Sequence, residues 1–169
     1  MNARTLTLIG SAVVFVVGIV AGFQMLIAKP DQPPEPASCQ ETKVAAGEEL
    51  TSNVVTVNVF NASKASGLAN RVNINLQRNG FLGGQIGNST SAAKPAPVTI
   101  LTNEPNDPRV KLVAAQFQDK VAYAVPDITV KQGVVIVIGD GFSRLKGKPA
   151  RSIVAATDVS TCVPVVALP

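Results

Sequence analysis

The sequence predicts an α/β protein in which one transmembrane helix precedes a compact two-layer α/β sandwich with a mixed sheet and two main helices. Three observations support this prediction. An uncharged apolar run extends from Leu6 to Ala28, and strand-like and helix-like patterns alternate from Val54 onward. A continuous Val-Val-Ile-Val-Ile stretch at 134–138 is typical of a central strand that is covered on both faces.

The apolar run 6–28 is predicted to be a retained signal anchor. At about 1.5 Å per helical residue it can cross roughly 30 Å of hydrocarbon, and it is longer than the apolar part of a cleaved signal peptide. Arg4 precedes the run, whereas Lys29 is diluted by nearby acidic residues. The positive-inside rule therefore predicts a cytoplasmic end at 1–5 and an extracytoplasmic C-terminal part in the cell membrane. The alternative, a buried soluble helix, needs a larger domain around it.

Three segments follow the anchor. Prolines at 30, 33, 34 and 36 indicate an extended, semi-rigid stalk at 29–52 rather than a packed element. Residues 53–142 carry the alternating patterns of the α/β domain. Residues 143–169 form a basic and apolar C-terminal tail, which we expect to pack on the domain.

The first half of the domain reads as strand, helix, strand. Alternating valines predict a strand from Val54 to Phe60. The next apolar stripe predicts a helix that Ser63 or Ser66 caps and that Gly80 ends in a left-handed conformation. A short strand at 81–86 completes this unit.

The second half repeats the pattern. A strand at 98–101 precedes a helix that begins at Asp107-Pro108, with the aspartate as N-cap and the proline in the first turn. Further strands are predicted at 121–125 and 133–138. Two strand-helix-strand units plus one strand imply a mixed sheet with helices packed on it.

The chain has two cysteines, Cys39 and Cys162, and both lie beyond the anchor. Thiols outside the cytoplasm tend to be oxidised, so we expect a disulfide between them. Two separate thiols, or a bond to another chain, are the alternatives. A metal site is not expected, because the chain has no histidine and two cysteines supply half of a tetrahedral site.

The sequence also argues against an enzyme. Without histidine, the choice of general bases is small, and each carboxylate of the folded part can be explained as a cap, a turn residue or a surface charge. These carboxylates are Glu104, Asp107, Asp119, Asp127, Asp140 and Asp158. Asp140 lies between two glycines and could bind a metal, although a turn is the commoner reason for such a pattern. We therefore expect no catalytic residues and no cofactor.

Two sets of residues are candidates for binding. The first is a basic run without intervening acids, suited to anionic lipids or glycans, and its alternative is an ordinary solvated face. It consists of Arg144, Lys146, Lys148 and Arg151. The second is a groove at the start of the first helix, with Asn61, Ser63, Gly67 and Arg71. No nucleic-acid partner is expected.

The motif Val-Thr-Val-Asn-Val-Phe-Asn-Ala-Ser at 55–63, followed by Gly-Leu-Ala at 67–69, Gly-Phe at 80–81 and the stretch 134–142, resembles the LytR C-terminal domain family. The whole layout is similar to envelope integrity proteins of high-GC Gram-positive bacteria. This resemblance implies an extracytoplasmic module that supports cell-envelope integrity. It also implies LytR-CpsA-Psr phosphotransferases as possible partners, because the domain is often attached to them. The family assigns the domain no catalytic residues.

Overall fold

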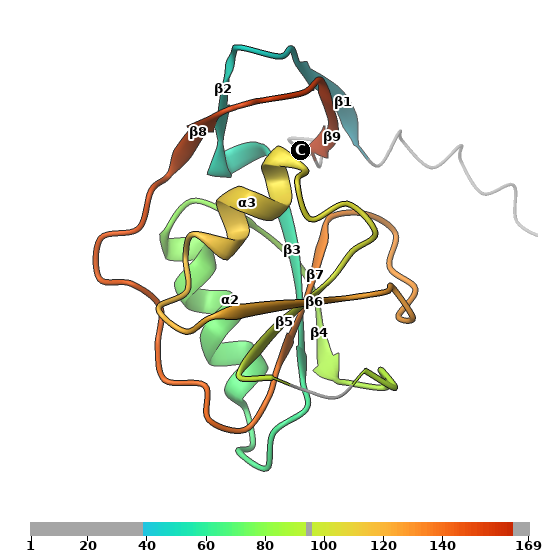
Figure 1. The fold of residues 1–169 in the computed structure, drawn as a ribbon, viewed down its shortest axis with the longest axis vertical. Coiled ribbons are helices and arrows are strands. Elements are labelled where there is room, and N and C mark those ends of the chain that lie inside the picture. Colours follow the sequence, from blue (N-terminus) through green and yellow to red (C-terminus); the bar gives the residue numbers. More distant parts are fainter. Residues whose placement is uncertain (1–38, 94–95, 164–169) are drawn as a thin grey trace, which may run out of the picture. The chain divides into compact units, whose positions relative to one another are not determined.

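A mixed five-stranded sheet with strand order β4-β3-β7-β5-β6 forms the centre of the domain (Figure 1). The structure is a computed structural model that describes residues 39–93 and 96–163. The predicted anchor at 6–28 lies outside these residues. Within the described ranges, no helix is long and apolar enough to cross a membrane.

The first strand-helix-strand unit agrees closely with the sequence prediction. It consists of β3 (Thr56–Asn61), α2 (Leu68–Arg78) and β4 (Leu82–Asn88). The two strands pair in parallel, as a crossover through a helix requires.

The second unit consists of β5 (Val98–Leu101), α3 (Pro108–Ala114) and β6 (Val121–Ala124), and its strands are also parallel. The remaining strand, β7 (Val134–Ile138), joins the two units. It pairs in parallel with β3 and antiparallel with β5, which makes the sheet mixed as predicted. All five β7 residues are buried, in agreement with its uninterrupted apolar sequence.

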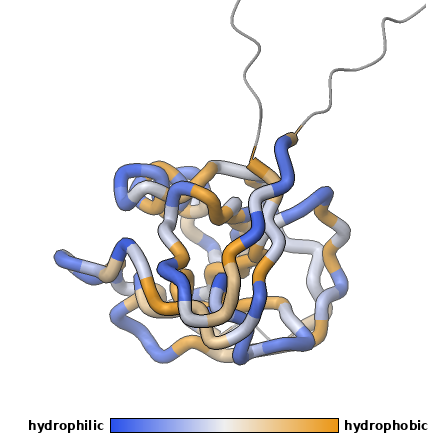
Figure 2. The backbone as a smooth tube through the Cα atoms, turned by 90° about the horizontal axis from the view of Figure 1, so that it is seen from above, coloured by the Kyte–Doolittle hydropathy of each residue, from blue (hydrophilic) through white to orange (hydrophobic). Residues whose placement is uncertain are grey.

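Both helices pack on one face of the sheet. Val57, Val59 and Ile136 point to that face and share a single core cluster with the apolar stripes of α2 and α3. The opposite face carries a smaller cluster around Phe60 and Val137, which is covered by loop residues rather than by a helix. The fold is therefore a two-layer α/β domain with two helices, and Figure 2 shows hydrophilic stretches around its outside.

The helix caps confirm two sequence predictions and correct one. Gly80 follows α2 with a φ of 100°, the left-handed conformation expected there, and Asp107 caps α3 by accepting the Arg109 N–H. Neither Ser63 nor Ser66 caps α2, however. The N-cap is Gly67, itself left-handed at φ 71°, and no side chain caps this helix.

The pairing of β3 with β4 is irregular, because its register shifts between Val57 and Val59. The side chain of Asn58 forms hydrogen bonds at this position. The Asn58 side chain is almost fully buried and accepts the Gln85 N–H at 2.8 Å. On the β4 side this bond compensates for the disrupted ladder, and the Asn58 amide also donates to the Gln132 carbonyl, just before β7, at 2.7 Å. Gly84 is required beside it, because a Cβ at that position would collide with the Asn58 oxygen.

The segments on either side of the sheet form two small antiparallel ribbons. β1 (Gln40–Val44) pairs with β9 (Val159–Val163), and β2 (Glu49–Thr51) pairs with β8 (Ser152–Val154). The 3-10 helix η1 (Ser52–Val54) leads from β2 toward β3. The second half of the expected stalk at 29–52 is thus paired strand rather than unpacked chain. Composition missed this because the strand partners lie in the distant C-terminal tail.

A disulfide joins Cys39 and Cys162, whose Cα atoms are 5.3 Å apart. It fastens the ribbon formed by β1 and β9. The tail also contributes to the core, since Ala155 and Val159 are buried in the main cluster together with Leu50.

Candidate functional site

The candidate site lies where the parallel strands β3 and β7 end side by side. Their carboxyl ends lead into two loops, 62–67 and 139–145, which meet at this edge of the sheet. The Ala62 N–H donates to the Ile138 carbonyl at 2.8 Å. The Lys64 N–H donates to a carboxylate oxygen of Asp140 at 3.0 Å. Asp140 therefore serves as a turn residue that ties the two loops together.

Asn61 shapes the first loop. Its side-chain oxygen Oδ1 accepts the Ser63 N–H at 3.0 Å and the Ser63 hydroxyl at 2.7 Å, and its side-chain amide Nδ2 donates to the Ala65 carbonyl at 2.8 Å. The Ser63 oxygen in turn accepts the Ala65 N–H at 3.2 Å. These local bonds explain why Ser63 is not free to cap α2.

A cavity of about 400 Å³ opens between α2 and the two loops. Its polar and charged lining comes from Ser63, Arg71, Asn75, Asp140, Ser143 and Arg144. Its apolar lining comes mainly from Leu68, Val72, Phe142 and Leu145. This volume lies within the range of about 300–1,000 Å³ that is usual for small-ligand sites.

The charge of this cavity is predominantly positive. Arg71 and Arg144 are both exposed, and neither forms an ion pair with any residue in the described ranges. Arg144 is held in place because its Nε donates to the Gln118 side-chain oxygen at 2.8 Å. The nearby start of α2 has no acidic residue in its first turn, so the positive end of the helix dipole is not neutralised there.

The other cations of the basic run do not line this cavity. Lys146, Lys148 and Arg151 are exposed further along the segment 143–151. That segment is fastened to the domain through Gln116, which is fully buried. The Gln116 amide donates to the Leu112 carbonyl at 3.1 Å and to the Ala150 carbonyl at 2.7 Å.

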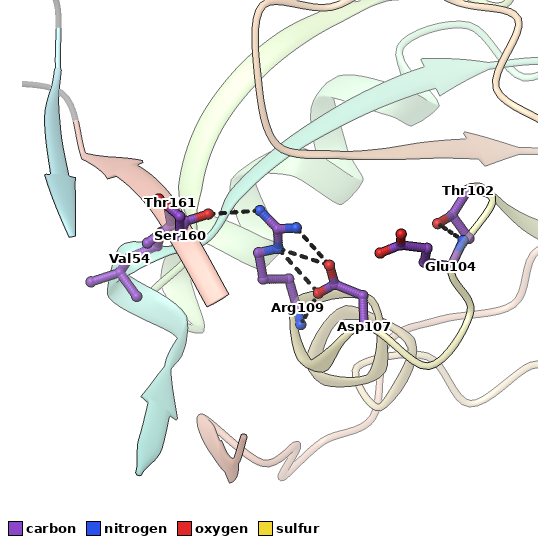
Figure 3. Close-up of polar contacts among 7 residues, drawn as sticks. All are labelled: Val54, Thr102, Glu104, Asp107, Arg109, Ser160 and Thr161. Atoms are coloured by element: carbon purple, nitrogen blue, oxygen red, sulfur yellow. Dashed lines mark hydrogen bonds and ion pairs between the residues drawn. The ribbon is translucent and has the colours of Figure 1, made fainter. Parts of the chain in front are cut away.

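A second polar cluster lies at the start of α3 and is structural in character (Figure 3). Arg109 forms an ion pair with Asp107 and donates to the Ser160 carbonyl of β9 at 2.9 Å. Burial alone would raise the pKa of the Asp107 carboxyl, but the hydrogen bonds and charge of Arg109 outweigh it and hold that pKa below its usual value. The bonds to Asp107 raise the pKa of Arg109. The pair connects the helix to the ribbon.

No metal or catalytic constellation is evident in the part of the chain that the structure describes. Within residues 39–93 and 96–163, no three His, Cys, Asp or Glu side chains are grouped so that they could hold a metal ion. Asp107 forms an ion pair with Arg109, and the carboxylates of Asp119 and Asp127 accept hydrogen bonds from the Ser143 and Ser91 hydroxyls.

The structure therefore combines parts of both predicted binding sets. Ser63 and Arg71 line the cavity together with Arg144, while Asn61 and Gly67 shape its rim without lining it. Sequence reasoning missed Asn75, Phe142 and Ser143. The one available signal was the pair of loops after β3 and β7, since neighbouring parallel strands bring such loops to the same edge.

A family model and a solved structure are similar to this chain. A family model described as "LytR cell envelope-related transcriptional attenuator" matches residues 54–142. Among solved structures, the soluble domain of a conserved hypothetical secreted protein, the Rv2700 ortholog from Mycobacterium marinum, matches with a TM-score of 0.48 and 16% sequence identity. The match covers 67% of this chain and 79% of that chain. None of the curated proteins matches. Because the family model spans more than half of the sequence, the chain belongs to the LytR C-terminal domain family.

Proposed function

We propose that this protein is a non-enzymatic, membrane-anchored extracytoplasmic module that supports cell-envelope integrity as a scaffold or binding partner in envelope assembly. The observation that carries the proposal is membership of a cell-envelope-related family over residues 54–142. The layout of anchor, proline-rich segment, domain and cysteine-bearing tail resembles the envelope integrity protein Cei of high-GC Gram-positive bacteria. LytR-CpsA-Psr enzymes are the protein partners that this resemblance favours.

Two features support an extracytoplasmic position of the domain. The apolar run 6–28 has the length of a spanning helix and a basic residue on its N-terminal side. The disulfide between Cys39 and Cys162 suits an oxidising compartment, since cytosolic thiols are kept reduced. Both features support the proposal that the C-terminal part lies on the outer side of the membrane.

This topology can be tested with single reporter cysteines. Thr90 is exposed, so Thr90→Cys is expected to react with a membrane-impermeant maleimide in intact cells whose wall has been permeabilised. Ala3→Cys, on the other side of the anchor, should react only after lysis. The native cysteines are paired and do not compete for the label. Labelling of Thr90→Cys only after lysis would contradict the proposed topology.

A second candidate function is binding of an anionic ligand, and the cavity between α2 and the loops favours it. Arg71 and Arg144 come from different segments, and both face a space of about 400 Å³ without an ion-pair partner in the described ranges. Guanidinium groups suit phosphate and carboxylate oxygens. The serine, asparagine and aspartate side chains of the lining are able to bond sugar hydroxyls. A cell-wall glycan that bears phosphate or carboxylate fits this combination better than a lipid head group alone.

Binding at the cavity and binding at the basic run can be distinguished by substitution. Changing Arg71 and Arg144 to Gln together is expected to weaken binding of purified anionic cell-wall polymer by roughly 10- to 100-fold, because two charged hydrogen bonds at exposed, water-screened side chains contribute about 1.4–2.8 kcal/mol in total. The matched control changes Lys148 and Arg151 to Gln, which lowers the net charge equally without touching the cavity. Binding would be measured by titration at low salt.

The control should bind nearly as well as the unaltered protein. Equal loss in both double variants would mean that only net charge matters and that the cavity is not the site. A larger loss in the control would assign binding to the basic run instead, as an exposed surface that salt screens strongly.

A further inference from the structure

β6 is an edge strand of the sheet, and it lacks the features that usually protect such an edge. It pairs with β5 on one side, and Figure 1 shows it in front of the other strands. Residues 121–125 read Val-Ala-Tyr-Ala-Val, without a charge, a proline or a glycine. Native edge strands normally carry lysines, prolines or bulges that prevent pairing with another chain. The opposite edge strand, β4, does have a register irregularity.

The free side of β6 is defined by its hydrogen bonds. The Thr102 N–H donates to the Ala124 carbonyl at 2.8 Å, so Ala124 and, by alternation, Ala122 face β5. The backbone groups of Val121, Tyr123 and Val125 therefore point outward. Among residues 39–93 and 96–163, no hydrogen bond reaches these outward groups.

The side chains of the outward residues lie on one face and are apolar. Val121 packs against the main core cluster, whereas Tyr123 is 44% exposed and Val125 is 72% exposed. Two large side chains with apolar surface thus stand beside a row of unpaired backbone donors and acceptors. Such an edge is suited to the addition of a further β-strand.

We propose that β6 pairs with β6 of a second copy of this chain, antiparallel and with a two-fold axis at Tyr123. In this register Tyr123 lies opposite Tyr123 of the second copy, and Val121 lies opposite Val125. All three are outward residues, so every outward N–H and C=O gains a partner.

The sequence selects a second copy over an unrelated strand because 121–125 is palindromic. A symmetric interface requires each surface to complement itself, and here valine meets valine, alanine meets alanine and tyrosine meets tyrosine. The segment has no charge, so the symmetric register brings no like charges face to face. The axis is perpendicular to the sheet, and the two sheets therefore continue into one, with all helices on the same face.

Covalent capture in intact cells tests this pairing, because the contact is smaller than the roughly 1,200–2,000 Å² of stable interfaces. Full-length Tyr123→Cys is treated with a short bismaleimide, and the native cysteines cannot react because they are paired with each other. The matched control is Ile86→Cys on the opposite edge strand β4, since Ile86 is exposed to the same extent, 44%. Cross-linked homodimer is expected to be at least about tenfold more abundant for Tyr123→Cys.

A second variant tests the register. Adding Val125→Lys to Tyr123→Cys places a charge opposite Val121 of the second copy and should reduce the homodimer at least roughly threefold. Val125 is largely exposed, so this change spares the fold. Equal cross-linking of Tyr123→Cys and Ile86→Cys, no effect of Val125→Lys, or attachment of Cys-bearing β6 to a different protein would each overturn the proposal.

Discussion

Replacing Cys39 and Cys162 with serine together is expected to lower the free energy of unfolding by about 4–5 kcal/mol. The two residues are 123 positions apart in sequence, so the disulfide closes a loop around nearly the whole domain. In the chain-entropy model, so long a loop restricts the unfolded chain strongly and leaves the folded chain almost unchanged. Denaturant unfolding, followed by circular dichroism, measures the difference.

Reduction supplies the control for this prediction. Unaltered protein kept in a reducing agent should unfold at the same denaturant concentration as the double serine variant. A difference of less than about 1 kcal/mol between oxidised and reduced protein would show that the β1–β9 ribbon and the core already hold the ends together.

Gln116→Ala is expected to destabilise the domain by about 3 kcal/mol. The side chain is fully buried and makes three hydrogen bonds, two to the Leu112 and Ala150 carbonyls and one from the Asn79 amide at 3.2 Å. Truncation leaves these partners unsatisfied and opens a cavity between α3 and the segment 143–151. The same unfolding measurement detects the loss.

Two further variants separate the loss of hydrogen bonds from the loss of packing volume. Gln116→Met keeps most of the volume and removes the hydrogen bonds, so its cost should lie between that of Gln116→Ala and zero. Gln118→Ala, at an exposed position two residues away, should change stability by no more than about 0.5 kcal/mol. If Gln116→Met were as mild as Gln118→Ala, the buried hydrogen bonds would contribute nothing.

The sequence predicts elements well where the signal is local. The strand 98–101 has the predicted bounds, Asp107 caps α3, Gly80 ends α2, and the run at 134–138 forms the buried central strand. In each case the residues themselves set the conformation, through apolar alternation, a short polar cap or a left-handed glycine. The mixed α/β class follows from the same signals.

Predictions from the sequence fail or remain untested where the structure of a segment depends on residues far away in the chain. The partners of β1 and β2 lie more than 100 residues away in the tail, so composition indicated a stalk. The cavity depends on Asp140 meeting Lys64, which are 76 residues apart. Ser63 and Arg71 can be predicted as candidate binding residues because they lie near the start of a predicted helix. The residues that face them across the cavity cannot be predicted in this way, because they depend on the order of the strands in the sheet. The anchor at 6–28 remains a prediction from length and charge.

The disulfide also determines how this domain bears tension. The strands that enter and leave the domain lie side by side, and a covalent bond joins them at Cys39 and Cys162. A pull between the two ends of the chain therefore passes through this bond and not through the central sheet, which carries no load. The cavity and the β6 edge keep their shape under such a pull. Only a force applied to the body of the domain itself, for example by a bound partner, would strain its core.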